Sequence, residues 1–436
     1  MVIVYSHTAS PRLLYLLDFL SHYYGQPFIL ADDKEVFLKE EGTKINYSNN
    51  SLESAIQIVP TGLLFQKGIH PIEIHCFQHQ ADFIAFFKTD DTFGFDLFAA
   101  IFYLLTRYEE YLPHQKDEYG RYAHQNSLAF KNDFLRIPLI NVWLEYFRKL
   151  IAPITPNPKP QTPNFSFLPT YDIDMAWSYR EKGFVRNMGG LAKSIVNGQW
   201  AMAQARITVL RGKEKDPFDC YDWLEELHSR HSLQPVYFFH AGKRQNAYDK
   251  SISVTNKAVR DLICITSKSA TIGLHPSWHS GDERAAIGEE KESIEAIIQQ
   301  PVTASRQHYI RFTLPQTFRH LLAAGITDDY SMGYGSINGF RASIASPFYW
   351  YDLERGEKTA LLLHPFCFMD ANSYYEQKDT PQQAFTELEH YYNEVKKVNG
   401  RLITVWHNSI LGTDATFQGW REIYERFIAH ISQSKA

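Results

Sequence analysis

The ten residues FSFLPTYDID, at positions 165–174, begin as an apolar run and end in two carboxylates. Six comparable runs follow it, at residues 234–242, 269–277, 304–312, 326–334, 359–370 and 401–408. Sequences typical of helices lie between most of them, and such an alternation indicates parallel strands covered by helices. We therefore expect an α/β fold, and seven units in succession favour a closed or nearly closed barrel over an open sheet.

The polar residues of these runs gather toward their ends. Most of the runs begin apolar and finish in Asp, His, Arg or Tyr. Parallel strands of a barrel present their carboxyl ends on one face, and barrel enzymes carry their active sites there. The sequence therefore predicts that the chemistry lies at the carboxyl ends of the strands.

The chain divides at the segment APITPNPKPQTP, residues 152–163, in which five of twelve residues are proline. Such a segment cannot continue a helix and is typical of a stiff linker. Residues 1–151 open with an expected strand at 2–5, a helix at 11–24 and a strand at 27–31, which predicts a smaller α/β domain of unknown role. Residues 164–436 hold the predicted barrel.

Composition narrows the function classes. The chain has 436 residues, 44% of them hydrophobic, and a net charge of −5, so it can form a full core and shows no polybasic footprint for nucleic acid. The four cysteines form no CxxC pair, which fits a reducing compartment. No signal peptide and no long apolar run is visible, so we expect a cytoplasmic protein without a membrane span. The oligomeric state stays open.

One segment interrupts the alternation. Residues 175–218 are expected to be helical, and between Met175 and Asp216 there are eight Lys or Arg against three Asp or Glu. The segment is either a solvated helical excursion or a docking surface for an anionic partner.

Asp172 and Asp174 are the first candidates for chemistry. Residues two apart on a strand point to the same side, so both carboxylates can face one pocket. Crowded carboxylates need a cation or a shared proton. His275 ends another apolar run, and His279 follows it by four residues. With Asp174 these two histidines make a candidate site for a divalent metal with open positions for water or substrate.

A metal site of this kind needs a base and an acid. Asp172 can take a proton from water, and His407, at the end of the last run, can protonate a leaving group. His364 ends the run LLLH and competes for the acid role. Arg306, with Tyr309, can position a carboxylate or stabilise an oxyanion, or Arg306 can form a buried structural pair with an aspartate.

Four tryptophans lie close in sequence to these candidates, at positions 177, 278, 350 and 406. Trp177, Trp278 and Trp406, with Tyr309, are candidate substrate-binding residues, because aromatic rings stack on sugars. Packing beneath the loops is the alternative.

The order of these motifs resembles the polysaccharide deacetylases of carbohydrate esterase family 4, the NodB-homology fold, over about residues 165–436. TYDID at 170–174 resembles the family's first motif, His275 and His279 its HxxxH motif, and ITVWH at 403–407 its last. The third motif, here at 306–309, lacks the usual proline. The full sequence is also similar to proteins of this class from Bacteroidetes that carry an extra N-terminal domain.

The resemblance implies a distorted (β/α)7 barrel and a hydrolase acting on carbon–nitrogen bonds other than peptide bonds. Its substrate would be an acetylated sugar or polysaccharide, and its cofactor a divalent metal, commonly zinc. It assigns Asp172 as the base and Asp174, His275 and His279 as ligands. The alternatives are a non-catalytic carbohydrate-binding protein and a non-haem iron enzyme, since two histidines and a carboxylate also suit Fe(II).

Overall fold

Nine strands of the C-terminal region (residues 164–436) form one sheet in the order β12-β13-β11-β10-β9-β8-β7-β15-β14. The computed structural model describes residues 1–52, 55–151, 164–242 and 246–433, so the predicted linker at 152–163 lies outside the described residues. The strands are β7 (Ser166–Ile173), β8 (Val236–His240), β9 (Thr271–His275), β10 (Ala304–Ser305), β11 (Asp328–Asp329), β12 (Phe348–Asp352), β13 (Glu357–Leu363), β14 (Phe368–Met369) and β15 (Arg401–His407). All neighbours run parallel except β12 and β13.

The sheet is open in the part of the chain that is described, so the expected distorted (β/α)7 barrel, closed or nearly closed, is not confirmed. As expected for a barrel, the last long strand, β15, pairs with the first, β7, and His407 lies opposite Asp172. However, β12 and β14 each have a single neighbour and form the two edges. The connection from β13 to β14 spans only residues 364–367. A parallel pair needs a crossover of a dozen or more residues, so β13 and β14 cannot close the ladder.

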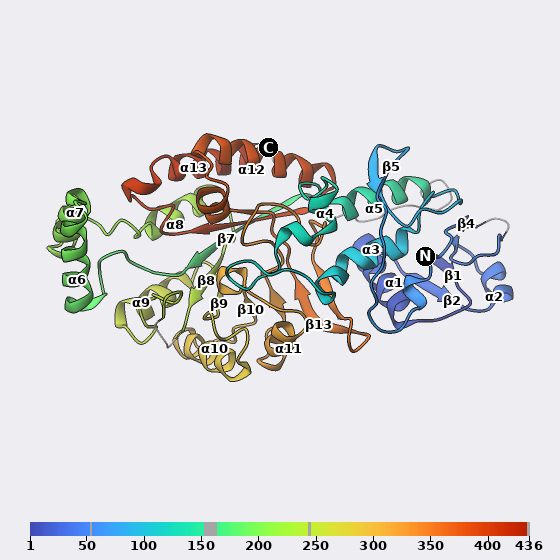
Figure 1. Cartoon of the computed structure of the whole chain (residues 1–436), viewed down its shortest axis with the longest axis horizontal. Coiled ribbons are helices and arrows are strands. Elements are labelled where there is room, and N and C mark those ends of the chain that lie inside the picture. The colour runs from blue at the N-terminus through green and yellow to red at the C-terminus, as the bar shows by residue number, and fades with distance from the viewer. Residues whose placement is uncertain (53–54, 152–163, 243–245, 434–436) are drawn as a thin grey trace.

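Helices cover the sheet on both sides (Figure 1), with α12 and α13 along one side and α9, α10 and α11 along the other. Their bounds are α8 (Tyr221–Arg230), α9 (Lys257–Thr266), α10 (Arg284–Ile298), α11 (Gln316–Ala323), α12 (Pro381–Lys397) and α13 (Trp420–Gln433). The start of α12 is fixed by sequence, because Thr380 and Gln383 form a capping box around Pro381. Its inward face, with Leu388, Tyr391 and Val395, is buried.

A second, smaller parallel sheet lies in the N-terminal region (residues 1–151), in the order β2-β1-β3-β4. Ser10 caps α1, which Pro11 begins and Gly25 ends in a left-handed conformation. The elements of this region are β1 (Val2–Tyr5), α1 (Pro11–Tyr24), β2 (Phe28–Ala31), α2 (Lys34–Lys39), β3 (Thr43–Asn46), β4 (Ile56–Gln57), β5 (Phe77–His79), β6 (Phe83–Ala85), α3 (Leu97–Leu105), α4 (Leu128–Lys131) and α5 (Leu139–Ile151).

The two regions share a buried interface. Glu110 accepts hydrogen bonds from Arg341 at 2.8 and 2.6 Å and from Arg107 at 2.7 Å, and all three side chains are buried. Burial alone would raise the pKa of Glu110, but the positive charges of Arg341 and Arg107 lower it to about 2. Buried charges are tolerated only when paired in this way, so this contact ties the N-terminal region to the C-terminal region.

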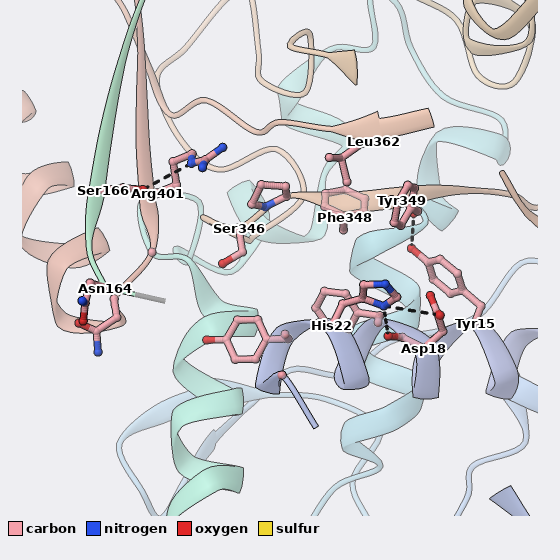
Figure 2. Close-up of a pocket in the computed structure, with 16 residues that line it drawn as sticks. Tyr15, Asp18, His22, Asn164, Ser166, Ser346, Phe348, Tyr349, Leu362 and Arg401 are labelled. Atoms are coloured by element: carbon pink, nitrogen blue, oxygen red, sulfur yellow. Dashed lines mark hydrogen bonds and ion pairs between the residues drawn. The ribbon is translucent and has the colours of Figure 1, made fainter. Parts of the chain in front are cut away.

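Helix α1 lies along β12 and β13 at the same interface. The Tyr15 hydroxyl donates to the Tyr349 carbonyl at 2.6 Å, and Lys358 pairs with Asp18 at 2.6 Å. A cavity of about 420 Å³ lies beside these contacts (Figure 2), near the amino ends of β7 and β15. It is therefore at the opposite end of the strands from the predicted chemistry.

Candidate metal centre and active site

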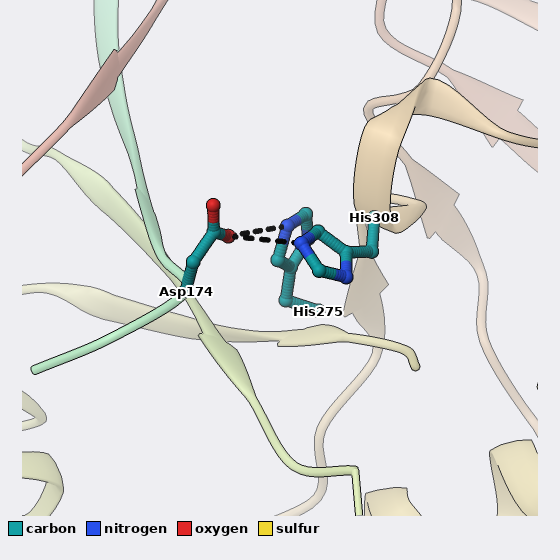
Figure 3. A group of neighbouring side chains, drawn as sticks. All are labelled: Asp174, His275 and His308. Carbon is teal, nitrogen blue, oxygen red and sulfur yellow. Dashed lines mark ion pairs between the residues drawn. The ribbon is translucent and has the colours of Figure 1, made fainter. Parts of the chain in front are cut away.

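The carboxyl ends of β7 and β9, with the turn after β10, bring Asp174, His275 and His308 together (Figure 3). The Asp174 Oδ1 atom lies 3.1 Å from His275 Nε2 and 3.6 Å from His308 Nε2. One ligand atom from each residue lies within 4.8 Å of the others. Two imidazoles and a carboxylate at this separation form a donor set suited to a divalent transition metal.

Each histidine is oriented by its second ring nitrogen. His275 Nδ1 lies 2.6 Å from the Arg306 carbonyl, and His308 Nδ1 lies 3.0 Å from Asp249 Oδ1. These oxygens only accept hydrogen bonds, so Nδ1 carries the proton and Nε2 points toward Asp174. Outer partners of this kind are typical of histidines that bind metals. Asp174 Oδ1 is buried with no hydrogen-bond partner among the described residues. A buried carboxylate oxygen without a partner is suited to bind a cation. The residues therefore fit a divalent ion.

The charges of the cluster shift its pKa values. Burial would raise the pKa of Asp174, but His308 and His275 hold it well below its usual range. Burial would likewise lower the pKa of His308, but Asp174 and Asp249 raise it to about 9. The carboxylates thus attract positive charge to this point, and a metal ion can replace the protons that the histidines would otherwise hold.

His279, which the HxxxH spacing selected as a ligand, lies outside this group. The backbone N–H groups of Ser277 and Trp278 donate to Glu290 and Asp249, and the chain then turns outward. His279 is exposed, on a separate cavity lined mainly by the acidic side of α10. His308 takes the third position instead. The signal that could have found it is its place three residues after β10, between the predicted Arg306 and Tyr309.

Asp172 lies next to the cluster and is held by Arg306. The guanidinium Nη1 donates to Asp172 Oδ1 at 2.8 Å, and both side chains are buried. The other carboxylate oxygen lies 3.9 Å from His275 Nε2. One oxygen of Asp172 is thus occupied by an arginine, and the second faces the candidate metal position.

His407 approaches from the strand on the far side of β7. Its Nδ1 lies 2.6 Å from Asp370 Oδ1, and its backbone N–H donates to Asp370 Oδ2 at 2.7 Å. Nε2 therefore faces Asp174 Oδ2, at 3.8 Å. Burial alone would lower the pKa of His407, but Asp370 and Asp174 raise it to about 10. The raised pKa favours the protonated imidazole, and its position beside the cluster suits a proton donor.

His364 occupies a different place. Its ring stacks on Tyr330, with centroids 4.2 Å apart, and its Nε2 lies 2.8 Å from Asp328 Oδ1. It does not line the cavity that holds His407. The structure therefore places His407, and not His364, beside the candidate metal ligands.

A cavity of about 400 Å³ opens at this cluster and is lined by Asp172, Asp174, His275, His308 and His407 among others. Its aromatic walls are three tyrosines, Tyr119, Tyr309 and Tyr375. The predicted tryptophans are not part of them.

The tryptophans have other contacts. Trp406 is fully buried and packs on Tyr424, and Trp177 is buried on another cavity, so neither lines the site. Trp278 stacks on Tyr248, with ring centroids 3.9 Å apart, and lies 5.3 Å from the ring of Tyr309. Of the three, only Trp278 lies near the cavity wall. Packing, the alternative reading, describes Trp177 and Trp406.

Two lining residues that the sequence did not predict come from the N-terminal region. Tyr119 and Arg121 line the cavity beside Tyr309. Arg121 Nη1 donates to the carbonyls of Tyr309 and Gly335, at 3.1 and 2.8 Å. Tyr309 and Ile310 have φ values of 58° and 55°, which non-glycine residues adopt only when their surroundings impose it. Arg121 thus supports the strained turn that carries His308.

One comparison with known proteins concerns the N-terminal region. A family of unknown function (DUF7033) matches residues 2–156. No curated protein matches the chain significantly.

Several solved structures resemble the chain over part of its length. Puue allantoinase has 12% identity and a TM-score of 0.42, covering 64% of this chain and 88% of that one. A probable polysaccharide deacetylase of Pseudomonas aeruginosa PAO1 has 13% identity and a TM-score of 0.39, covering 62% and 84%. The polysaccharide deacetylase Bc1974 of Bacillus cereus has 10% identity and a TM-score of 0.31, covering 62% and 88%. These identities and TM-scores are too low to support a function, so the function has to be argued from the contacts of the site itself.

Proposed function

We propose that this protein is a metal-dependent hydrolase that removes acetyl groups from an acetylated sugar or polysaccharide. The observation that carries the proposal is the placement of Asp172 and His407 on either side of Asp174, His275 and His308 in one cavity. A ligand set alone would suit many metal proteins. A carboxylate and a protonated histidine flanking it supply the two proton-transfer groups that amide or ester hydrolysis requires.

Asp174, His275 and His308 would hold the ion, which we propose is zinc. When bound, a divalent cation of this kind polarises a carbonyl and makes water more acidic. The resemblance to the deacetylases implied His279 as the third ligand. In this proposal His308 takes that position and His279 binds no metal.

The chain's own residues supply the proton transfers. Asp172 accepts a proton from the water that attacks the acetyl carbonyl, through the oxygen that Arg306 leaves free. The Arg306 contact fixes the orientation of the Asp172 carboxylate. His407, held by Asp370, donates a proton to the leaving nitrogen or oxygen of the sugar. Water and the acetylated sugar thus give acetate and the free amine or hydroxyl.

The proposal is tested by changing Asp172 to asparagine, which keeps the shape of the side chain but removes its basicity. Acetate release from an N-acetylated chito-oligosaccharide should fall by on the order of 10²–10⁴-fold, the usual range for a lost general base. Metal content, measured by elemental analysis, should stay unchanged. Asp328→Asn is the matched control, because Asp328 pairs with His364 outside the cavity.

Two results would contradict the proposal. Loss of metal in Asp172→Asn would make Asp172 a ligand rather than the base. Tight carbohydrate binding by the zinc-loaded protein without acetate release from N- or O-acetylated probes would favour a non-catalytic binding protein.

The same two-histidine, one-carboxylate set also suits Fe(II) in oxygen-using enzymes. Acetate release by the zinc-loaded protein under anaerobic conditions would exclude that alternative, because hydrolysis needs no oxidant.

A further inference from the structure

The helices α6 (Gly183–Val196) and α7 (Trp200–Leu210) form a hairpin that stands away from the rest of the molecule (Figure 1). It lies in the long connection between β7 and β8, ahead of α8, in the segment that is rich in Lys and Arg. Four of its large apolar side chains are strongly exposed: Phe184 at 79%, Val185 at 82%, Val196 at 84% and Trp200 at 67%. Helices of soluble proteins normally bury such residues, so this hairpin has its apolar side chains outside.

The contact between α6 and α7 is formed mainly by polar and small side chains. Asn187, Ser194 and Ala203 are buried there. The Arg206 guanidinium donates to Asn187 Oδ1 at 2.9 Å, and a Cβ atom on Gly190 would lie 2.7 Å from the same guanidinium. The two helices therefore pack closely while most of their large apolar side chains stay exposed and available for another contact.

The apolar residues of α6 form one stripe. Phe184, Met188 and Ile195 are exposed and recur at spacings that place them on one face of a helix. Arg186 and Lys193, seven residues apart, lie together on a different face and are also exposed. The helix is amphipathic, but its apolar face points to solvent rather than to the protein.

The base of the hairpin is fixed to the body. The buried carboxylate of Asp216 accepts hydrogen bonds from the backbone N–H groups of Ser178, Tyr179 and Arg180, at 2.8, 2.8 and 3.0 Å. The chain entering the hairpin is thereby joined to the chain leaving it. The exposed stripe is thus presented in a defined position.

We propose that the α6–α7 hairpin docks this protein on the surface of an anionic lipid bilayer. An exposed apolar stripe on one face of a helix, with basic side chains on the other face, is the pattern of helices that lie in a membrane interface, where Lys and Arg reach the headgroups. Charge favours this partner, because residues 175–216 hold eight Lys or Arg against three Asp or Glu. No helix among the described residues is long and apolar enough to cross a bilayer, so the contact is superficial.

A second copy of the chain fits the hairpin less well. In a symmetric dimer the same patch meets itself, which would bring two basic surfaces together. The proposal is also independent of the hydrolytic chemistry proposed above, because it makes no use of the metal site.

Co-flotation of the full chain with vesicles tests the proposal. The protein should bind vesicles containing about 30 mol% anionic lipid, bind neutral vesicles much more weakly, and dissociate as salt is added. The double variant Phe184→Ser, Trp200→Ser should weaken partitioning by on the order of 10²-fold, since it removes two large apolar contacts. Leu14→Ser with Ile265→Ser is the matched control, because these side chains are 50% and 58% exposed on α1 and α9.

A charge variant completes the test. Lys193 on α6 and Lys213, three residues after α7, are both exposed. Lys193→Glu with Lys213→Glu should reduce binding to anionic vesicles by at least about 25-fold, from about fivefold for each basic residue lost. Failure of the unaltered protein to bind anionic vesicles would overturn the proposal, and so would binding that the Phe184 and Trp200 changes leave intact. A dimer in sedimentation that those changes dissociate, without vesicle binding, would assign the surface to a second copy.

Discussion

Replacing Arg121 by alanine should weaken the metal site, although Arg121 belongs to the N-terminal region and touches none of the candidate ligands. Its guanidinium holds the carbonyls of Tyr309 and Gly335 and pairs with Asp117 at 2.6 Å. Tyr309 directly follows His308, so a change in the backbone of Tyr309 moves the imidazole beside it. Arg121 is thus a positioning residue for the site.

The free energy that the Arg121 hydrogen bonds contribute is similar in size to the cost of the left-handed backbone that they support. Loss of these bonds should therefore allow the turn to relax. A buried carbonyl that loses its donor costs about 1–3 kcal/mol, so two of them cost roughly 2–6 kcal/mol. The left-handed conformations of Tyr309 and Ile310 cost about 1–3 kcal/mol each. Without Arg121 the contacts that impose this conformation no longer exceed its cost, and the turn should relax. Altered positions of ligand partners usually cost 10–100-fold in metal affinity, and we expect a loss of about that size.

Metal affinity of the full chain, measured by competition with a chelating dye, checks this prediction without need of a substrate. Arg121→Lys keeps the charge but cannot reach both carbonyls in the same geometry, so it should rescue only part of the loss. Arg136→Ala is the control, because Arg136 lies in the same region, is largely exposed and pairs at 3.8 Å with Glu387. Unchanged metal affinity in Arg121→Ala, with the fold retained, would refute the reasoning.

Three further changes test the site and the interface. His308→Ala should remove most of the metal and His279→Ala should not, because only His308 faces the metal-site carboxylate; equal metal retention by elemental analysis would contradict the ligand set. His407→Ala should lower kcat by on the order of 10²–10⁴-fold with metal retained, and His364→Ala should change it little; the reverse would exchange their roles. Glu110→Gln should lower the unfolding free energy by about 3 kcal/mol at neutral pH. Because pairing lowers the folded pKa of Glu110 from 4.5 to about 2, this difference should shrink as pH falls from 4.5 toward 2, and a constant difference in urea titrations would count against it.

The strands that sequence predicted well are those with long apolar runs. β7, β8, β9 and β15 lie within the predicted segments, because burial on both faces imposes the same residue types along the whole strand. Whether the sheet closes into a barrel could not be predicted from these runs. The answer depends on the short connection at 364–367 and on β12, an antiparallel edge strand that the repeating pattern did not include.

The sequence predicted those site residues that lie at the end of a strand. It did not predict those that lie in a turn. Asp174 and His275 follow directly from the strand pattern. His308 lies in a turn whose left-handed backbone no apolar pattern marks. Arg121 lies far away in sequence from the turn that it supports, so only the fold could show that they meet.

The contact of α1 with β12 bears on how the chain reaches its fold without aggregating. β12 is an edge strand of an open sheet, and an uncovered edge is a template for pairing with other chains. The Tyr15 hydroxyl donates a hydrogen bond to the Tyr349 carbonyl on that strand. During synthesis the N-terminal region emerges first and can fold before β12 exists. It therefore acts as a built-in shield for the strand that needs it, and a chain beginning at residue 164 should expose that edge as soon as it is made.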